Sequence, residues 1–522
     1  MQKLKIPFQE IGSIPQFIKD FLNDEIPQFR NYRFTLEHIT QVIQQKSSLF
    51  SSQQRQILVQ ALQKQLQNFT LSEKQSHHLE LLLQRNTFTV TTGHQLNLFS
   101  GPVFFIYKIL QTIKTADFLN QNSEYKFVPI FWMATEDHDF EEIDHFKTEQ
   151  NFYQIKGKSG GAVGRIVIED VSFIDEFEKE FKDDVFGTQL ILLMKKAYQK
   201  GKTLTEATQT LVQELFSEFG LLMIDGDDVL LKNQMAAIFS SELKDEITNQ
   251  YSKENIQFIT NQYGKVQVNP RGINLFYLSE TRNRIVKNGD QYEVLDKNLK
   301  FSFEEITQDF SKISPNALLR PVFQEKVLPN VAYIGGNAEI MYWLELPEVF
   351  KQFAVPFPVL IPRNSMLFLK NKTYQKIEKS GLNILDFFGN FQVKLNQNLL
   401  QESPISELLA ENEQAIKTHF ESLKNKASIT DVTFKNLVEA EETRQMKSFS
   451  RMKKRLLRAE KIKNADRLDF LERLYLEIHP SGNWQERALN FSNFFAENGN
   501  VWLNNCYQEM DVDKSMLILM EN

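Results

Sequence analysis

The chain of 522 residues is too long for one simple core, and its length predicts about two to four domains. Hydrophobic residues make up 42% and charged residues 24%, which is typical of a soluble globular protein. The formal net charge of −7 argues against a bulk electrostatic attraction to nucleic acid, although a local basic patch stays open. We therefore expect no nucleic-acid partner.

The cysteine content and the apolar runs bear on the compartment. The single cysteine, Cys506, can form neither an internal disulfide nor a CxxC metal site, which fits a cytoplasmic location. A lone cysteine is more often a buried small hydrophobe than a nucleophile, and we expect this of Cys506. No apolar run suits a signal peptide or approaches the about 18 to 20 residues that span a bilayer, so no membrane association is expected.

The expected elements begin with helices and change to an alternation of strands and helices. Residues 1–85 carry apolar side chains at helical spacing and form an N-terminal helical segment that packs on the core. Residues 87–92 are β-branched and aromatic and predict a strand, after which Pro102 opens a helix. The apolar run 126–133 predicts a second strand, buried on both faces. Together they form a right-handed βαβ unit with parallel strands.

Similar short runs recur further along the chain and predict more strands of the same sheet, at 220–225, 331–336 and 356–361. Strands that alternate with helices predict an α/β fold with an open parallel sheet. We expect this core over residues 86–392. Residues 150–215 and 245–305 interrupt the alternation and are interpreted as insertions or a small subdomain. Residues 477–522 form a C-terminal segment that returns to the core.

Residues 393–476 show the pattern of two long amphipathic helices. Apolar side chains recur at helical spacing over 395–423 and again over 437–474. Thr430 or Asp431 could cap the second helix. Two such helices joined by a short turn predict an antiparallel coiled-coil hairpin.

Polar or ionisable residues follow every expected strand. Ligands of open α/β sheets bind outside the carboxyl ends of the strands, so these residues predict one shared active-site cleft. The candidates from these strand ends and the motifs around them are Gly93, His94, Gln95, Asn97, Gly101, Glu136, Asp137, His138, Asp139, Arg320, Gly336, Asn337, Glu339 and Arg363.

The first motif is TTGHQLNLFSGPVFFIYK. Gly93 lets the backbone approach a ligand, and a following helix N-terminus favours an anion. His94 could bind a phosphate or act as a general acid or base, and the alternative is a histidine that holds a tight turn. The chain contains neither GxGxxG nor GxxxxGK[ST], so the usual nucleotide fingerprints are missing.

The second motif, ATEDHDFEEIDH, concentrates carboxylates and histidines. Glu136, Asp137, His138 and Asp139 could bind an amine or sugar hydroxyls of a substrate. A divalent metal site is the second interpretation, and an acidic helix start is the third. In the third motif, RPVFQEKVLPNVAYIGGNAEIMYW, Arg320 could pair with a carboxylate or phosphate, as could Arg363 further on. A structural salt bridge is the alternative for either arginine.

These motifs, together with HPSGNWQER near the end, resemble the bacillithiol biosynthesis cysteine-adding enzymes, in order and over nearly the whole chain. The resemblance implies a Rossmann-like core with connecting insertions, an α-helical antiparallel coiled-coil domain and a homodimer. It also implies a C–N ligase that joins L-cysteine to glucosaminyl-malate. Carried onto this chain, the site includes His94, Gln95, Asp137, His138, Asn337 and Glu339, with His94, Asp137 and His138 as the catalytic residues.

The resemblance further implies an adenine nucleotide, ATP or ADP, near the C-terminal region. Gly482, Trp484 and Arg487 are the weak candidates for that site. An amine does not attack a free carboxylate, so activation of cysteine as an acyl phosphate or acyl adenylate would fit. No metal is required by the sequence, although Mg²⁺ stays open. The alternatives are a metal-dependent hydrolase that uses Asp137, His138, Asp139 and His145, and a non-enzymatic coiled-coil scaffold.

Overall fold

The computed structural model describes residues 3–427 and 429–521. The chain divides into two compact units. The first contains Ile14–Phe368 and both chain ends, up to Gln9 and from Asn483 onward. The second contains Leu369–Gly482 with the short segment Glu10–Ser13. The division after Phe368 lies before residue 392, where the change in sequence pattern had placed the end of the core.

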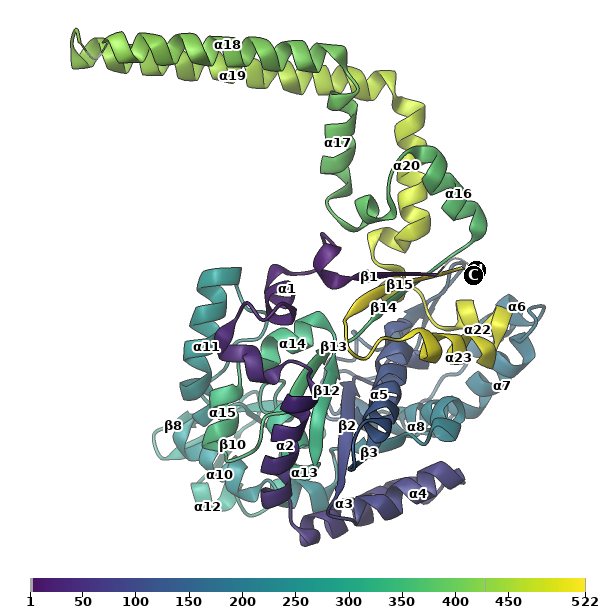
Figure 1. The fold of residues 1–522 in the computed structure, drawn as a ribbon. Coiled ribbons are helices and arrows are strands. Elements are labelled where there is room, and N and C mark those ends of the chain that lie inside the picture. Colours follow the sequence, from purple (N-terminus) through teal and green to yellow (C-terminus); the bar gives the residue numbers. More distant parts are fainter. Residues whose placement is uncertain (1–2, 428, 522) are drawn as a thin grey trace. The chain divides into compact units, whose positions relative to one another are not determined.

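A five-stranded parallel sheet forms the centre of the first unit (Figure 1), as the apolar runs predict. Its strands along the chain are β2 (Thr87–His94), β3 (Lys126–Met133), β6 (Leu222–Asp225), β12 (Asn330–Gly335) and β13 (Val359–Pro362). The prediction that β2 and β3 are parallel neighbours is confirmed, with Thr87 opposite Lys126 and His94 opposite Met133. Strand β2 is longer than expected and includes Gly93 and His94.

The order of the strands places a switch point in the middle of the sheet. Across the sheet the order is β13-β12-β2-β3-β6. The chain first builds outward from β2 through β3 to β6, and it then returns to the other side of β2 to add β12 and β13. This is the doubly wound, Rossmann-like order, in which ligands bind where the direction reverses. Here that place is between the carboxyl ends of β2 and β12.

Helices cover both faces of this sheet. Adjacent residues of a strand point to opposite faces, and the ring of Phe131 contacts Phe105 while the ring of Trp132 contacts Phe323. Helix α5 (Phe104–Gln121) therefore lies on one face and helix α13 (Arg320–Val327) on the other. Burial on both faces explains why these strands are continuous apolar runs. Helix α5 begins two residues after Pro102.

The N-terminal segment is helical except at its start. Its helices are α1 (Gln16–Leu22), α2 (Leu36–Leu49), α3 (Ser52–Leu66) and α4 (Glu73–Leu82). Strand β1 (Leu4–Pro7) was not expected from the sequence and pairs antiparallel with β15 (Met516–Glu521), whose other neighbour is β14 (Ser365–Leu369). Between β13 and β15 in sequence, but in the same unit, lie α21 (Gln485–Ala488), α22 (Ser492–Asn498) and α23 (Asn500–Glu509).

Two insertions extend the core. The first carries β4 (His145–Lys147), β5 (Phe152–Gln154), α6 (Phe173–Phe181), α7 (Gly187–Ala197) and α8 (Leu204–Phe216). After β6 come α9 (Val229–Asn233), α10 (Ala236–Asp245) and α11 (Ile247–Tyr263). A second, antiparallel sheet follows, from β7 (Leu275–Leu278), β8 (Arg282–Asn288), β9 (Gln291–Val294), β10 (Leu299–Phe301) and β11 (Ile313–Pro315), with α12 (Phe303–Ile306). Helices α14 (Asn337–Trp343) and α15 (Pro347–Gln352) follow β12.

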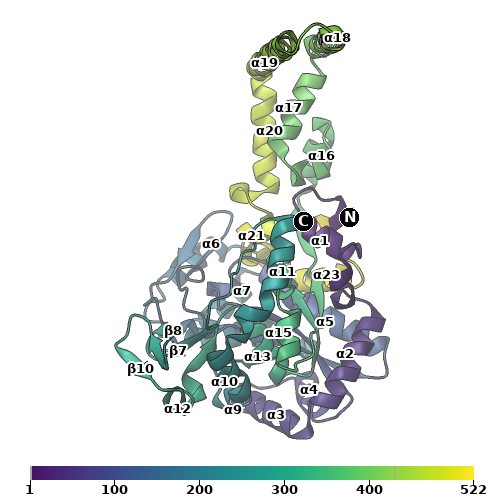
Figure 2. The same ribbon diagram turned by 90° about the vertical axis from the view of Figure 1, so that its left-hand side faces the viewer.

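The second unit is helical and contains the expected hairpin. Helices α18 (Pro404–Ala427) and α19 (Val432–Lys463) lie side by side, and Figure 2 shows them nearly end-on. Asp431 caps α19, accepting from the backbone N–H of Phe434 at 2.7 Å. Helices α16 (Asn371–Ser380), α17 (Phe391–Gln401) and α20 (Ala465–Ile478) complete the unit.

Each arm of the hairpin was expected to be one uninterrupted helix, and this was wrong. Pro404 separates α17 from α18, because a proline lacks the N–H that a helix interior needs. Asn464, with φ −107° and ψ 25°, separates α19 from α20. Among the described residues, none of the helices combines the length and apolar character needed to cross a membrane.

Candidate active site

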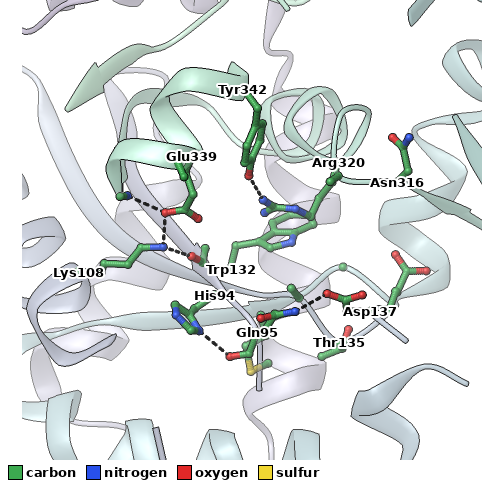
Figure 3. A pocket seen from close by; sticks show the side chains of 18 of the residues that line it. His94, Gln95, Lys108, Trp132, Thr135, Asp137, Asn316, Arg320, Glu339 and Tyr342 are labelled. Atoms are coloured by element: carbon green, nitrogen blue, oxygen red, sulfur yellow. Dashed lines mark hydrogen bonds and ion pairs between the residues drawn. The ribbon is translucent and has the colours of Figure 1, made fainter. Parts of the chain in front are cut away.

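A cavity of about 340 Å³ opens at the carboxyl ends of the central strands (Figure 3). It is lined by Gly93 and His94 at the end of β2, by residues 132–137 at the end of β3 and just after it, and by Gly336 after β12. It therefore lies at the switch point that the strand order defines. Gly93 is needed here for space, because a Cβ atom at this position would lie 3.0 Å from Arg320 Nη1.

His94 is held by contacts on two sides. Its Nδ1 lies 3.0 Å from the backbone carbonyl oxygen of Gln95, and its ring contacts those of Phe104 and Phe105. A carbonyl only accepts, so this contact assigns the proton of the neutral ring to Nδ1 and leaves the lone pair on Nε2. Burial, with the nearby Lys108 ammonium, lowers the pKa of His94 to about 4. The imidazole is therefore neutral at physiological pH.

A buried ion pair joins helix α5 to the start of α14. Lys108 Nζ donates to Glu339 Oε2 over 2.7 Å and to the carbonyl oxygen of Gly93 over 2.5 Å. Glu339 Oε2 also accepts from the backbone N–H of Gly336 at 2.7 Å. Burial alone would raise the pKa of Glu339, but Lys108 and the Gly336 N–H hold it below its usual range.

Besides Arg282, three arginines line the cavity. Arg320 donates from Nη2 to the hydroxyl of Tyr342 at 2.8 Å, while its Nη1 is buried without a hydrogen-bond partner among the described residues. Arg363 forms a bidentate pair with the buried Glu486, at 2.9 and 2.6 Å. Arg487 lies over the ring of Phe104, with its guanidinium carbon 5.7 Å from the ring centre. Arg320 and Arg487 are thus the arginines best placed to accept an anionic group.

Two carboxylates that follow β3, those of Glu136 and Asp137, also line the cavity. Gln95 Nε2 donates to Asp137 Oδ2 at 2.7 Å (Figure 3), and the backbone N–H of His138 donates to Asp137 Oδ1 at 2.8 Å. Arg282 of β8 reaches the same group, with Nη1 3.0 Å from His138 Nδ1 and 3.8 Å from Asp137 Oδ1. Burial would raise the pKa of Asp137, but these partners hold it well below its usual range.

A second charged group lies beside it. Lys232 Nζ, itself buried, is 2.6 Å from Glu136 Oε1 and 2.8 Å from Asp227 Oδ1. Thr135 lines the cavity and donates its hydroxyl to Asp225 at the end of β6. Burial raises the pKa of Asp225 to about 7. The cavity lining thus carries both arginines and carboxylates.

The structure brings ten of the candidate residues together around the cavity and leaves the others outside its lining. Those that line it are Gly93, His94, Gln95, Glu136, Asp137, Arg320, Gly336, Glu339, Arg363 and Arg487. Those outside the lining are Asn97, Gly101, His138, Asp139, Asn337, Gly482 and Trp484.

Local geometry accounts for several of the residues outside the lining. Asn97 is 8% exposed and donates to the carbonyl of Glu142 at 3.3 Å. Gly101 adopts φ +61° against Asn97, a conformation that favours glycine. Asp139 accepts from the Glu142 N–H at 3.3 Å in an exposed turn, and His138 contacts Arg282. Asn337 is the first residue of α14.

The weak nucleotide candidates are divided between the two units. Gly482 belongs to the second unit, whereas Trp484 and Arg487 belong to the first. Arg487 lines the central cavity. The expected adenine-nucleotide site at these residues stays a prediction.

Several lining residues were missed by the sequence reasoning. Lys108 gave a signal, since it is a lone lysine inside the apolar run FFIYKIL. Arg282, Asn316 and Tyr342 gave none, because they reach the cavity from the second insertion and from the far end of α14. Only the folded insertion brings Arg282 beside Asp137.

The residues of the metal-hydrolase alternative do not converge. His145 Nδ1 lies 2.7 Å from Asp144 Oδ1 and its ring contacts that of Phe152 at a tilt of 31°, while His138 contacts Arg282. Within residues 3–427 and 429–521, no three His, Cys, Asp or Glu side chains are grouped as ligands of one metal ion. The carboxylates that do line the cavity are bound to Lys232, Lys108 or Gln95.

A doubly wound α/β domain with a charged cavity at its switch point, in a chain that also carries a helical hairpin, defines a Rossmann-like enzyme with a coiled-coil domain. The family models agree with this description. The N-terminal Rossmann-like domain of bacillithiol biosynthesis BshC matches residues 1–364, and the C-terminal coiled-coil domain of BshC matches residues 366–521. The chain belongs to the bacillithiol biosynthesis BshC family, which confirms the resemblance seen in its motifs.

Similar proteins extend over nearly the whole chain. A protein of Flavobacterium johnsoniae is 38% identical over 95% of both chains, and one of Flavobacterium psychrophilum is 37% identical over 96% of both. A protein of Christiangramia forsetii is 34% identical over 97% of this chain and 96% of its own. All three are named "Putative cysteine ligase BshC". The present chain is accordingly an enzyme of the ligase class.

Proposed function

We propose that this enzyme forms the amide bond between the carboxyl group of L-cysteine and the amine of glucosaminyl-malate, giving bacillithiol. Membership of the BshC family and the name of its relatives support this reaction. The observation that carries it in the structure is the charge distribution of the cavity. Glucosaminyl-malate bears one ammonium group and two carboxylates, and the cavity lining carries both carboxylates and arginines, which can pair with them.

The carboxyl group of cysteine must be activated before the amine can attack it. We propose that an adenine nucleotide supplies this activation, as an acyl phosphate or an acyl adenylate. Arg320 Nη1, which lacks a partner among the described residues, and Arg487 are suited to stabilise the negative charge that develops on the leaving group. The amine nitrogen then forms the C–N bond, and the phosphate or the nucleoside monophosphate leaves with the electrons of the broken C–O bond.

Two protons must leave the substrate nitrogen in all. The first passes to solvent when the ammonium becomes the free amine, and the second leaves as the C–N bond forms. Asp137 is engaged by hydrogen bonds from Gln95 and from the backbone N–H of His138, and Glu136 is bound to Lys232. His94 is neutral, and the lone pair on Nε2 is free of the contact that Nδ1 makes with Gln95. We assign His94 as the general base that takes the proton as the C–N bond forms.

The decisive experiment incubates the protein with glucosaminyl-malate, L-cysteine and ATP and follows the thiol product and the nucleotides. We expect bacillithiol to form together with one equivalent of ADP, for an acyl phosphate, or AMP, for an acyl adenylate. A matched reaction without ATP should give no product. Folded protein that forms no thiol product with all three reactants present would refute the ligase, and product without nucleotide would refute only the activation step.

We also propose that the enzyme is a homodimer that uses the coiled-coil hairpin. The family resemblance suggests the dimer, and α18 and α19 expose large apolar side chains, among them Leu408 at 62% and Leu437 at 61%. Light scattering should give twice the chain mass of 61.1 kDa at micromolar concentration. Replacing Leu408 and Leu437 with lysine should shift the mass toward one chain. A monomeric mass of the unaltered protein would contradict the proposal.

A further inference from the structure

Lys108 is a buried lysine at the inner end of the cavity. It lies on α5 among apolar residues, and its side chain is only 2% exposed. Its ammonium group carries two hydrogen bonds, to the Gly93 carbonyl at 2.5 Å and to Glu339 at 2.7 Å. Burying a charged amine is unfavourable unless partners replace its water, so this lysine is held by specific contacts at the site.

The first contact bears directly on His94. The carbonyl of Gly93 belongs to the peptide group that continues into the backbone nitrogen of His94. Because that peptide group is planar, a hydrogen bond to its oxygen fixes the plane from which the His94 side chain projects. Phe104 and Phe105, which pack against the imidazole, lie on the same helix as Lys108. Helix α5 therefore holds both the backbone and the ring of His94.

The second contact joins the two strands of the switch point. Glu339 accepts from Lys108 and from the backbone N–H of Gly336, which follows β12. Tyr333 of β12 also donates to Glu339, over 3.2 Å. Lys108 thus connects the end of β2 with the start of α14, the two elements between which the cavity opens (Figure 3).

We propose that Lys108 is a positioning residue of this enzyme: its ammonium group fixes the Gly93 carbonyl and the Glu339 carboxylate, and it thereby orients the His94 imidazole toward the cavity. The catalytic consequence rests on the proposed function of His94 as the general base. The proposal that Lys108 orients the His94 imidazole does not depend on that function, because it concerns only the position of the ring.

The charges around His94 give the proposal a measurable signature. Lys108 and Arg363 face the imidazole and disfavour its protonation, while Glu339 and the carbonyl of Gln95 favour it. Burial adds to the effect of the cations and is the largest contribution. Replacing Lys108 by methionine removes a cation and leaves Glu339 without its partner. Both changes favour the protonated imidazole, so the pKa of His94 rises.

The test combines a spectroscopic titration with kinetics on the same proteins. Histidines are labelled with ¹³C at Cε1, and the His94 signal is assigned with His94→Gln. In Lys108→Met we expect the His94 titration to move up by about 1 pH unit. The acid limb of kcat/KM should move by the same amount, with kcat reduced by about tenfold or more. Lys114→Met is the matched control, because Lys114 lies on the same helix over the ring of Tyr507, outside the cavity lining.

A double variant guards against a folding defect. Lys108→Met combined with Glu339→Gln removes both charges of the pair. The pKa of His94 in this double variant should lie between its values in the unaltered protein and in Lys108→Met. An unmoved His94 titration in both folded variants would overturn the proposal, even if activity fell. If the unaltered enzyme shows no ligase activity, the proposed function fails, while the titration still decides whether Lys108 acts on the His94 imidazole.

Discussion

Gln95 and Asp137 connect the carboxyl ends of β2 and β3, with 2.7 Å between the Gln95 amide nitrogen and Asp137 Oδ2. The two residues are 42 positions apart in the sequence and become neighbours because their strands pair in parallel. Arg282 approaches the same carboxylate from the second insertion. The Asp137 carboxylate is thereby held between Gln95 and Arg282, and it remains ionised at physiological pH.

Asp137→Asn should reduce kcat/KM by about 10²-fold, as is typical for a charged group that acts on the reacting amine. The amide keeps the size of the side chain but loses the negative charge that, in the proposed reaction, attracts the substrate ammonium. Its thermal unfolding should change little, since the side chain is 30% exposed. Asp139→Asn is the control, because Asp139 lies in an exposed turn outside the lining. An Asp137→Asn enzyme with unaltered kinetics would remove this carboxylate from the site.

A buried ion pair away from the cavity gives a prediction for stability. Lys46 of α2 and Glu325 of α13 are each 1% exposed, and their charged groups lie 3.1 Å apart. Lys46→Met should lower the free energy of unfolding by about 3 to 5 kcal/mol, since it leaves a buried carboxylate without its partner. Denaturant unfolding measures this. Adding Glu325→Gln should recover part of the loss. In contrast, Lys64→Met, which removes a 62% exposed lysine 3.6 Å from Asp228, should cost under about 1 kcal/mol, because Asp228 keeps its hydrogen bond from the Leu230 N–H.

The strands of the central sheet could be predicted because each is an apolar run buried on both faces and bounded by glycine, proline or polar residues. The cleft could also be located, since parallel strands bring their carboxyl ends to one edge. The strand order could not be predicted, because nothing local in β12 records that it pairs with β2. For the same reason Arg282 was missed, as its place beside Asp137 depends on how a whole insertion folds.

The limits of local patterns are clearest in the hairpin and the first motif. Apolar spacing continues through Pro404 and Asn464, so spacing alone joins helices that the backbone separates. In the first motif, both His94 and Asn97 were expected in the site as polar residues after a strand, and His94 in addition as a catalytic residue. Only the tertiary contacts separate them, since Asn97 donates to the Glu142 carbonyl and His94 faces the cavity.

His78 predicts how stability depends on pH. It is buried, its Nδ1 lies 2.6 Å from the Gly220 carbonyl, and burial lowers its pKa to about 4 from the ordinary 6.5. Between these values the unfolded chain binds a proton that the folded chain does not, so stability falls as the pH falls from about 6.5 to about 4. The total effect of this histidine is at most about 3 kcal/mol.

The measurement compares Tm at pH 7.5 and pH 5.0. His78→Gln keeps a donor toward Gly220 without a titrating group, so its decrease in Tm should be smaller than that of the unaltered protein by about 2 to 4 °C. The control is the exposed neighbour of His78, His77. The Tm of His77→Gln should decrease between the two pH values by as much as the Tm of the unaltered protein. Equal decreases in all three proteins would show that His78 titrates normally in the fold.

Cys506 lies fully buried in α23, and burial raises the pKa of its thiol well above the ordinary value. A buried, protonated thiol is a poor nucleophile, so the thiol of the reaction should belong to the substrate. Cys506→Ser should lower Tm, because it buries a hydroxyl, and should leave turnover nearly unchanged. A loss of more than about tenfold in a folded variant, equivalent to about 1.4 kcal/mol of barrier, would contradict this.

His94→Ala should fold normally and lose about 10²-fold or more in kcat, as expected for a general base. His94 is the last residue of β2, and it lines the cavity. Its Nδ1 is hydrogen-bonded to the Gln95 carbonyl oxygen, which leaves the lone pair on Nε2. Because its pKa is about 4, His94 should not limit activity between about pH 5 and pH 8. A histidine that only stabilised the turn would behave differently, since its removal would lower Tm and leave the turnover of each folded molecule intact. Measuring Tm and kcat on the same preparation separates the two cases, and a destabilised variant with near-normal turnover per folded molecule would exclude His94 from the chemistry.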